Sequence, residues 1–273
     1  MSLLAISNIA WTAAEDRSAY ELLGKLGIKG LEVAPTRIHP DIFSAPKSLL
    51  KDFRKMVLEL SGAEIVSLQS LHFGRPDLSL FGEDKKATEL YEHTKKAVDL
   101  AVALGARNLV FGSPKNRLIP PAYQSNAWDE AVDFFSRLGT YAESYDVTIS
   151  IEPNPEAYGA NFITRTAEAI KIVKEINLNN FRINLDLGTC WLNQENPAAF
   201  VLEQTNIIGH IHISEPMLGA IPGQVDMETH KLLSDAIKRS NYGKWISLEM
   251  RAISGDNLGC IRQALEFALD IYT

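Results

Sequence analysis

Four acidic or imidazole side chains stand in short alternating segments of the second half of the chain: Glu152, Asp186, His212 and Glu249. Successive side chains of a strand point to opposite faces, so these four share the face opposite the isoleucines and leucines of the same segments. Three carboxylates and one imidazole in a low-dielectric interior require a compensating cation. The pattern therefore predicts a site for one divalent metal ion.

The donor set narrows the choice of metal. Oxygen ligands with a single imidazole suit Mn²⁺, Mg²⁺ or Co²⁺, and Zn²⁺ also accepts them. Four protein ligands on an octahedral ion leave two positions, enough for a hydroxy-carbonyl substrate or for waters. The alternative is a buried layer of ion pairs without chemistry, in which Arg182 or Arg251 on the same face neutralises the carboxylates.

Eight strand-like segments alternate with eight amphipathic ones from end to end. The predicted strands are Leu3–Asn8, Gly30–Ala34, Glu64–His72, Asn108–Gly112, Val147–Glu152, Arg182–Asp186, Ile207–Ser214 and Trp245–Met250. The predicted helices are Glu15–Leu26, Lys47–Leu60, Asp84–Leu104, Ala127–Tyr145, Arg165–Ile176, Pro197–Glu203, Asp226–Ser240 and Leu258–Tyr272. Gly27, Gly105 and Gly243 follow such helices, where a left-handed C-terminal cap needs glycine.

Strand then helix, repeated, means parallel pairing. We therefore predict an α/β fold with one domain, residues 1–273, forming a single (β/α)8 barrel with its active site at the C-terminal strand ends. A doubly wound open sheet is the weaker alternative, because no glycine-rich phosphate turn follows the first segment.

The composition excludes several classes of protein. With 46% hydrophobic and 22% charged residues the chain is typical of a globular protein, and its net charge of −7 disfavours a nucleic-acid partner. Its two cysteines form no disulfide framework or CxxC motif. There is no basic leader and no run of about 18 apolar residues. We therefore expect a cytoplasmic protein with no membrane partner.

Four motifs resemble the sugar-phosphate isomerase/epimerase group of xylose-isomerase-like TIM barrels. They are Ile151-Glu-Pro-Asn154, Asn184-Leu-Asp-Leu-Gly188, Gly209-His-Ile-His-Ile-Ser-Glu215 and Trp245-Ile-Ser-Leu-Glu249. The group includes ketose 3-epimerases, hydroxypyruvate isomerase, inosose dehydratase and the type IV AP endonucleases. The resemblance implies one divalent ion held by Glu152, Asp186, His212 and Glu249, with the two glutamates also moving the substrate proton. Many relatives are dimers or tetramers, which implies a possible homo-oligomer.

This arrangement suits a defined chemistry. Removal of a proton next to a carbonyl needs an electrophile on the carbonyl oxygen and a base close to the C–H bond, and a metal and a glutamate provide both. We predict an isomerase or epimerase that acts on a small sugar, keto-sugar or sugar phosphate through a metal-stabilised enediolate. The alternatives are a lyase of the inosose-dehydratase type, a metal-dependent endonuclease and a non-catalytic sugar-binding barrel.

Two departures from the family pattern matter. Many members have a histidine three residues after the aspartate of the sixth strand, where this chain has Thr189, so one substrate contact is altered. The endonuclease branch needs a zinc-binding histidine near the end of the fourth strand, where Phe111 cannot ligate a metal. Together with the acidic net charge, Phe111 disfavours the nuclease.

The remaining candidates surround the predicted mouth of the barrel. The substrate-binding candidates are His72, Lys115, Asn154, Glu215 and Arg251. Lys115 and Arg117 share a loop that suits a phosphate or carboxylate, or that is simply solvated. Glu215 is also placed to orient His212 through its second ring nitrogen. Glu32 faces inward, but an ion pair with Arg37 explains it equally well.

The other histidines and aromatic residues that stand out have more ordinary interpretations. We expect His210 to pack in the core or to support a ligand, and Asp226 and His230 to form a surface pair on one helix face. Trp11 and Phe73 are candidates for an apolar wall over a sugar ring, although core packing explains them at least as well.

Overall fold

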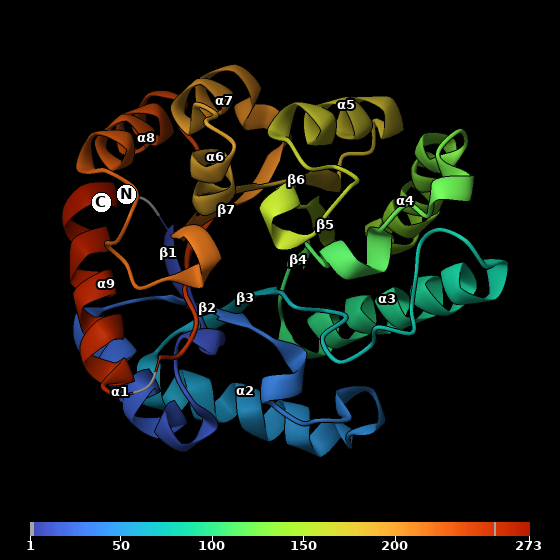
Figure 1. Cartoon of the computed structure of the whole chain (residues 1–273). Coiled ribbons are helices and arrows are strands. Elements are labelled where there is room, and N and C mark those ends of the chain that lie inside the picture. The colour runs from blue at the N-terminus through green and yellow to red at the C-terminus, as the bar shows by residue number, and fades with distance from the viewer. Residues whose placement is uncertain (1–2, 254) are drawn as a thin grey trace.

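The computed structural model describes residues 3–253 and 255–273 (Figure 1). Within them, eight parallel strands form a closed barrel in chain order, and the last pairs with the first. The strands are β1 (Leu3–Ser7), β2 (Gly30–Val33), β3 (Glu64–Leu68), β4 (Asn108–Phe111), β5 (Thr148–Ile151), β6 (Phe181–Asp186), β7 (Ile208–Ser214) and β8 (Trp245–Glu249). The predicted (β/α)8 barrel is confirmed.

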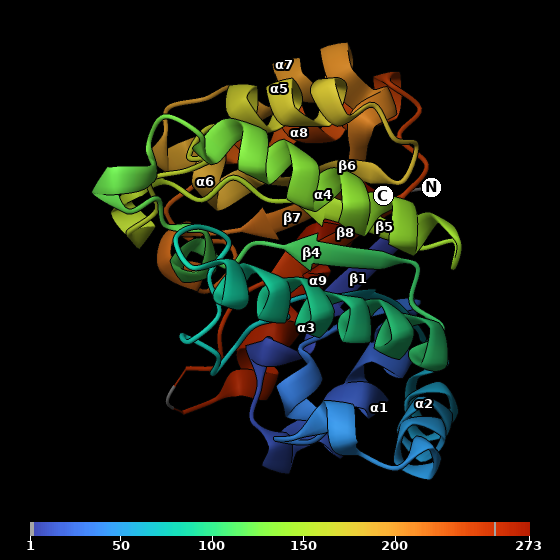
Figure 2. The ribbon, with the colours of Figure 1, turned by 90° about the vertical axis from the view of Figure 1, so that its right-hand side faces the viewer.

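The helices surround the strands, and the side view shows α3 and α4 running alongside the barrel wall (Figure 2). They are α1 (Asp16–Leu26), α2 (Lys47–Ser61), α3 (Asp84–Leu104), α4 (Ala127–Glu143), α5 (Thr166–Ile176), α6 (Leu187–Leu192), α7 (Pro197–Gln204), α8 (Met227–Arg239) and α9 (Asn257–Tyr272). None of these helices has the length and apolar character needed to span a lipid bilayer.

Polar side chains inside the barrel bond to one another across neighbouring strands. Asn108 donates from Nδ2 to Ser67 Oγ at 3.0 Å and accepts at Oδ1 from Ser150 Oγ at 2.6 Å. Ile149 and Ile151, of the opposite parity, are fully buried in the hydrophobic core. The predicted alternation is therefore confirmed, and the side chains of Ser67, Asn108 and Ser150 inside the barrel satisfy one another.

Most boundaries lie within a few residues of the prediction, and three local features differ from it more clearly. β3 ends at Leu68 instead of His72, since Ser70 has a positive φ of 53° that breaks the extended chain. The helix α6 begins directly at the end of β6, where the Asp186 side chain caps it by accepting from Thr189 N. The expected cap at Gly243 is wrong, because the left-handed residue after α8 is Asn241 (φ 53°).

The predicted caps at Gly27 and Gly105 are confirmed, since both adopt left-handed φ values, of 72° and 83°, immediately after α1 and α3. Only glycine takes this conformation without steric cost, so both helices end where the sequence indicates.

Gly30 closes the barrel near its N-terminal end and tolerates no side chain. A Cβ atom there would lie 2.6 Å from Trp245 Cζ3 and 2.7 Å from Ala5 Cβ. We expect Gly30→Ala to destabilise the fold by about 1–3 kcal/mol through overpacking, as measured by urea unfolding. Gly243→Ala is the control, because its new Cβ would have Asn241 O at 3.9 Å as its close neighbour. Equal unfolding free energies for the two variants would contradict this packing argument.

Candidate active site

The four predicted ligands converge at the C-terminal ends of β5 to β8. His212 Nδ1 lies 3.1 Å from Glu249 Oε2, 3.4 Å from Glu152 Oε2 and 3.9 Å from Asp186 Oδ2. The parallel register pairs Asp186 with His212 and Ser214 with Glu249, which brings the side chains to one level of the barrel. His212 is fully buried, and the three carboxylates are at most 12% exposed.

The second ring nitrogen of His212 contacts a carboxylate from the other half of the barrel. Glu32 on β2 is completely buried, and its Oε1 lies 3.0 Å from His212 Nε2. Its Oε2 lies 3.2 Å from Nε2 of His210, which also bonds Ser247 Oγ at 2.8 Å. His210 is therefore buried and reaches His212 through Glu32, and its support of a metal ligand stays a prediction.

Two predictions about these groups are wrong. Glu32 does not pair with Arg37, whose Nη2 bonds Asp16 Oδ1 at 2.8 Å. Glu215 does not orient His212, because its carboxylate accepts hydrogen bonds from the backbone amides of residues 223–225 and so holds that loop. Glu32 is therefore a stronger candidate for the site than the sequence indicated, and its inward parity on the second strand was the available signal.

Amide and hydroxyl donors fix two of the carboxylates. Glu152 accepts from Asn184 Nδ2 at 2.7 Å on Oε2 and from Asn154 Nδ2 at 2.8 Å on Oε1. Asp186 accepts from Thr189 N and from Ser214 Oγ, both at 2.6 Å. The inward residue Asn184 was not predicted as part of the site, although it shares the parity of Asp186.

The pKa values report an excess of negative charge. Burial, together with the charges of Glu152 and Asp186, raises the pKa of Glu249 to about 7. Burial and the charge of Glu152 also raise the pKa of Asp186. Burial lowers the pKa of His212, but the negative charges of Glu32 and Glu249 outweigh this effect and raise the pKa well above its usual value.

The alternative of a neutralising ion-pair layer is wrong. In the described part of the chain, no lysine or arginine forms an ion pair with Glu32, Glu152, Asp186 or Glu249. Arg251 is exposed beyond the end of β8, and Arg182 stands near the opposite end of β6 from Asp186. Among the described residues, the one cation within ion-pair distance of Glu152, Asp186 and Glu249 is thus the imidazole of His212, which offsets their charge only in part.

A divalent ion fits these residues. Glu152, His212 and Glu249 each offer one ligand atom, and these atoms lie within 4.8 Å of one another. A carboxylate on the second nitrogen of a ligating histidine holds its tautomer and ring orientation, which is the position of Glu32. Glu32, His210 and His212 form a second close group, but their atoms already bond one another.

The substrate-binding candidates fall into two groups. Asn154 touches Glu152, and His72 and Lys115 line a cavity of about 500 Å³ between the loops that follow β3 and β4. His72 is buried, with Nδ1 2.8 Å from Ser113 Oγ and Nε2 2.9 Å from Thr94 Oγ1. Lys115 and Arg251 are exposed, and their roles toward a substrate remain predictions.

Several neighbouring residues have structural roles. Arg117 is wholly buried, so the predicted solvated or anion-binding loop is wrong for this side chain. His230 is buried as well and bonds Tyr272 through Nδ1, which rules out the expected surface pair with Asp226. Trp11 is buried in the core, whereas Phe73 is 72% exposed.

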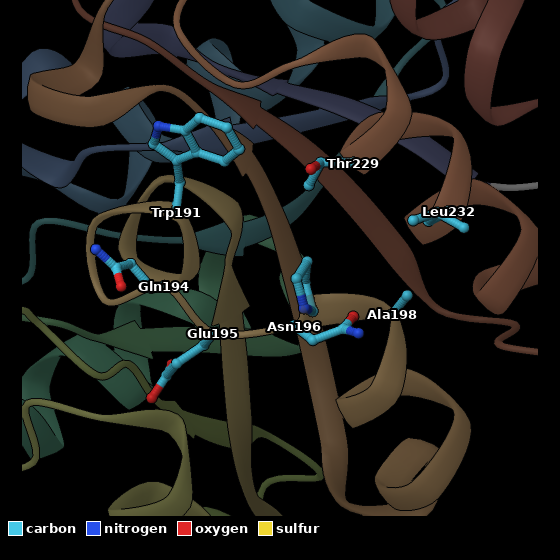
Figure 3. A pocket seen from close by; sticks show the side chains of 8 residues that line it. Trp191, Gln194, Glu195, Asn196, Ala198, Thr229 and Leu232 are labelled. Carbon is cyan, nitrogen blue, oxygen red and sulfur yellow. The ribbon is translucent and has the colours of Figure 1, made fainter.

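A separate cavity of about 530 Å³ lies between the segment from α6 to α7 and the helix α8 (Figure 3). It is lined by Trp191, Gln194, Glu195, Asn196, Pro197, Ala198, Thr229 and Leu232. Its carboxylate, Glu195, accepts from Thr166 N and Oγ1 and so ties α5 to this segment. None of the predicted ligands lines it, and we place the site at the carboxylate cluster.

Loss of the Glu32 carboxylate should weaken metal binding without removing a ligand. We expect Glu32→Gln to lower the affinity for Mn²⁺ by about 10–100-fold, because a second partner of a ligating histidine contributes to that extent. Isothermal titration of the full chain measures it. Glu64→Gln, at an exposed position of β3, is the matched control. An unchanged Mn²⁺ affinity in Glu32→Gln would show that Glu32 does not support the site.

His72 makes the fold sensitive to acid. Burial, with the charges of His93 and Arg75, lowers its pKa to about 3. The unfolded side chain titrates near pH 6.5, so its stabilising contribution is complete above that pH and is lost as pH falls toward 3. We expect His72→Gln to lose less unfolding free energy than the parent chain between pH 7 and pH 5 in urea titrations. Parallel losses in the two proteins would contradict this.

Comparison with known proteins agrees with this architecture. The sequence model of the xylose isomerase-like TIM barrel family matches residues 20–271. A search of curated protein sequences gives no match. The chain is structurally similar to a D-psicose 3-epimerase determined in the presence of D-fructose, at 16% identity and a TM-score of 0.79, covering 100% of this chain and 99% of that one.

Two further structures are similar over nearly their whole length. One is a D-allulose 3-epimerase from Methylomonas sp. in complex with D-allulose (21% identity, TM-score 0.77, 99% and 97% covered). The other is the IolI protein with a bound zinc atom (17% identity, TM-score 0.74, 100% and 98% covered). At these identities the likeness concerns the fold, and the family follows from the sequence match. The chain belongs to the family of xylose isomerase-like TIM barrels.

Proposed function

We propose that this protein is a divalent-metal-dependent isomerase or epimerase of a small sugar, keto-sugar or sugar phosphate. The observation that carries the proposal is the pair of glutamates, Glu152 and Glu249, whose carboxylates both lie within 3.4 Å of His212 Nδ1. Structural neighbours named as ketose epimerases and a neighbour with bound zinc support it.

Four residues would hold the metal: Glu152, Asp186, His212 and Glu249. When bound, a divalent ion supplies a Lewis acid that polarises a substrate carbonyl and so acidifies the adjacent C–H bond. Asp186, fixed by Thr189 N and Ser214 Oγ, and His212, held by Glu32, serve as ligands only. Their rigid support keeps the geometry constant while a proton moves elsewhere in the site.

The two glutamates would move the proton. Two side-chain amides donate hydrogen bonds to Glu152 and hold it in one orientation. These donors favour the ionised carboxylate, which is the form that can accept a proton. Glu249 extends from the last residue of β8 toward the same imidazole. Two carboxylates on different strands allow one to remove a proton and the other to return it, as an epimerase requires. An aldose–ketose isomerase needs only one of them.

The reaction can be followed by solvent deuterium. The metal-reconstituted chain is incubated in D₂O with a panel of ketoses and ketose phosphates, and NMR detects deuterium at the carbon next to the carbonyl. We expect exchange with at least one sugar, reduced about 10²–10⁴-fold in Glu152→Gln and in Glu249→Gln because each loses a proton-transferring group. The product, an epimer, an isomer or a dehydrated sugar, distinguishes the reaction types.

The control for this experiment is Glu143→Gln at the exposed end of α4, which should exchange deuterium at the parent rate. The proposal fails if no exchange occurs with any sugar that demonstrably binds to the metal-loaded protein.

A further inference from the structure

Arg117 is a buried cation that the proposed reaction leaves without a role. It ends the short helix Pro114–Arg117 after β4, and its side chain is completely buried. Burial lowers its pKa to about 10, so it stays charged at neutral pH. A buried charge is retained only where specific contacts offset its desolvation. The position of those contacts therefore indicates what Arg117 does.

The hydrogen bonds of Arg117 go to one short segment. Its Nη2 donates to the backbone oxygen of Glu152 at 2.5 Å and to Asn154 Oδ1 at 2.9 Å. Among the described residues, Nε and Nη1 have no protein partner, so the guanidinium gains its hydrogen bonds from residues 152–154 alone. This segment carries the candidate ligand and base Glu152.

A guanidinium fixes the orientation of the Asn154 amide. Arginine can only donate hydrogen bonds, so the atom of Asn154 that faces it must be the oxygen. The amide nitrogen is then turned toward Glu152, where Nδ2 donates to Oε1 at 2.8 Å. With the amide reversed, the Asn154 nitrogen and Arg117 Nη2, both donors, would face each other, and the Asn154 oxygen would face the carboxylate of Glu152. The contacts thus form a chain from Arg117 through Asn154 to Glu152 Oε1.

The backbone around Glu152 limits other adjustments. Glu152 N donates to Phe111 O at 3.1 Å, and Asn154 N donates to Ile163 O at 3.1 Å. A Cβ at Gly112 would lie 3.1 Å from Glu152 Oε1, so the carboxylate packs directly against that backbone. Close packing therefore restricts the side chain of Glu152. The hydrogen-bond donor to its Oε1 is Asn154, whose orientation depends on Arg117.

We propose that Arg117 is a positioning residue: it locks the amide of Asn154, which holds Glu152 Oε1 in the orientation used for metal binding and proton transfer. The proton-transfer part rests on the proposed function, whereas the effect on metal binding does not. Arg117 itself touches neither the substrate nor the metal in this proposal.

Five variants of the full chain test it: Arg117→Met, Asn154→Ala, the double variant, Arg117→Lys and Asn116→Ala. Asn116 is the matched control, because it is also buried on the same short helix, but its Nδ2 donates to Arg75 O and Leu78 O, both at 2.8 Å. Arg117→Lys keeps a donor-only cation that can still face Asn154 Oδ1. Each variant is assayed for deuterium exchange, Mn²⁺ affinity and thermal unfolding.

We expect Arg117→Met to lower kcat of exchange and Mn²⁺ affinity about 10–100-fold each while KM changes less than about threefold. Asn154→Ala should have a similar effect, and the double variant should be no worse than Arg117→Met, because both changes break one chain of contacts. Arg117→Lys should recover most of the loss. Asn116→Ala should lower the melting temperature without changing kcat or the affinity.

The proposal is overturned if Asn116→Ala and Arg117→Met reduce kcat and Mn²⁺ affinity equally, or if the effects of Arg117→Met and Asn154→Ala multiply in the double variant. If the parent chain binds Mn²⁺ but exchanges deuterium with no sugar, the proposed function fails while the affinities still decide the role of Arg117. Equal Mn²⁺ affinities of Arg117→Met and the parent chain would then reject it.

Discussion

The structure depends on how the barrel accommodates more buried negative charge than its side chains neutralise. The carboxylates of Glu32, Glu152 and Glu249 each lie within 3.4 Å of a ring nitrogen of the single imidazole of His212, and Asp186 lies 3.9 Å away. Within the described residues no arginine or lysine completes the set as an ion pair. A buried charge left without a partner costs several kcal/mol. A bound divalent cation would offset this cost, and protonation of Glu249, whose pKa burial raises to about 7, lowers it as well.

The parallel barrel makes such a cluster possible. Each inward position of a strand contributes one side chain to the interior. At the C-terminal strand ends, side chains from residues far apart in the chain meet at one level of the barrel. Beneath them the interior polar groups are already paired, as Asn108 is with Ser67 and Ser150. Amides from Asn154 and Asn184 then fix Glu152 without adding charge. The proposed metal ligands are thus the interior carboxylates, with His212, that no arginine or lysine of the described residues neutralises.

The strand pattern was enough to predict the barrel and its inward face, because period-two alternation survives in a parallel sheet regardless of what the loops do. It also indicated the four side chains that the strand ends bring together, whose role as metal ligands stays a prediction. It could not predict the partner of Glu32, since His212 lies 180 residues away and meets it across the barrel. It also placed Arg117 in a loop that either binds an anion or is solvated, whereas the side chain is buried. The left-handed backbone at Ser113 (φ 45°) turns that loop inward, and a serine carries no local signal for such a turn.

Short elements at the strand ends escaped prediction for a related reason. The helix α6 has six residues and starts at the capping side chain of Asp186, so it is too short to show helical periodicity. His72 is likewise carried beyond β3 by the positive φ of Ser70. Backbone conformations of single residues decide where these side chains point, and residue type alone does not reveal them for non-glycine positions.

The most direct test of the central claim is anomalous diffraction at the manganese edge from crystals of the full chain equilibrated with Mn²⁺. We expect one anomalous peak per chain within coordination distance of Glu152, Asp186, His212 Nδ1 and Glu249, with Glu32 still bonded to His212 Nε2. Absence of a peak at saturating Mn²⁺, or a peak elsewhere with these four side chains unchanged, would contradict it.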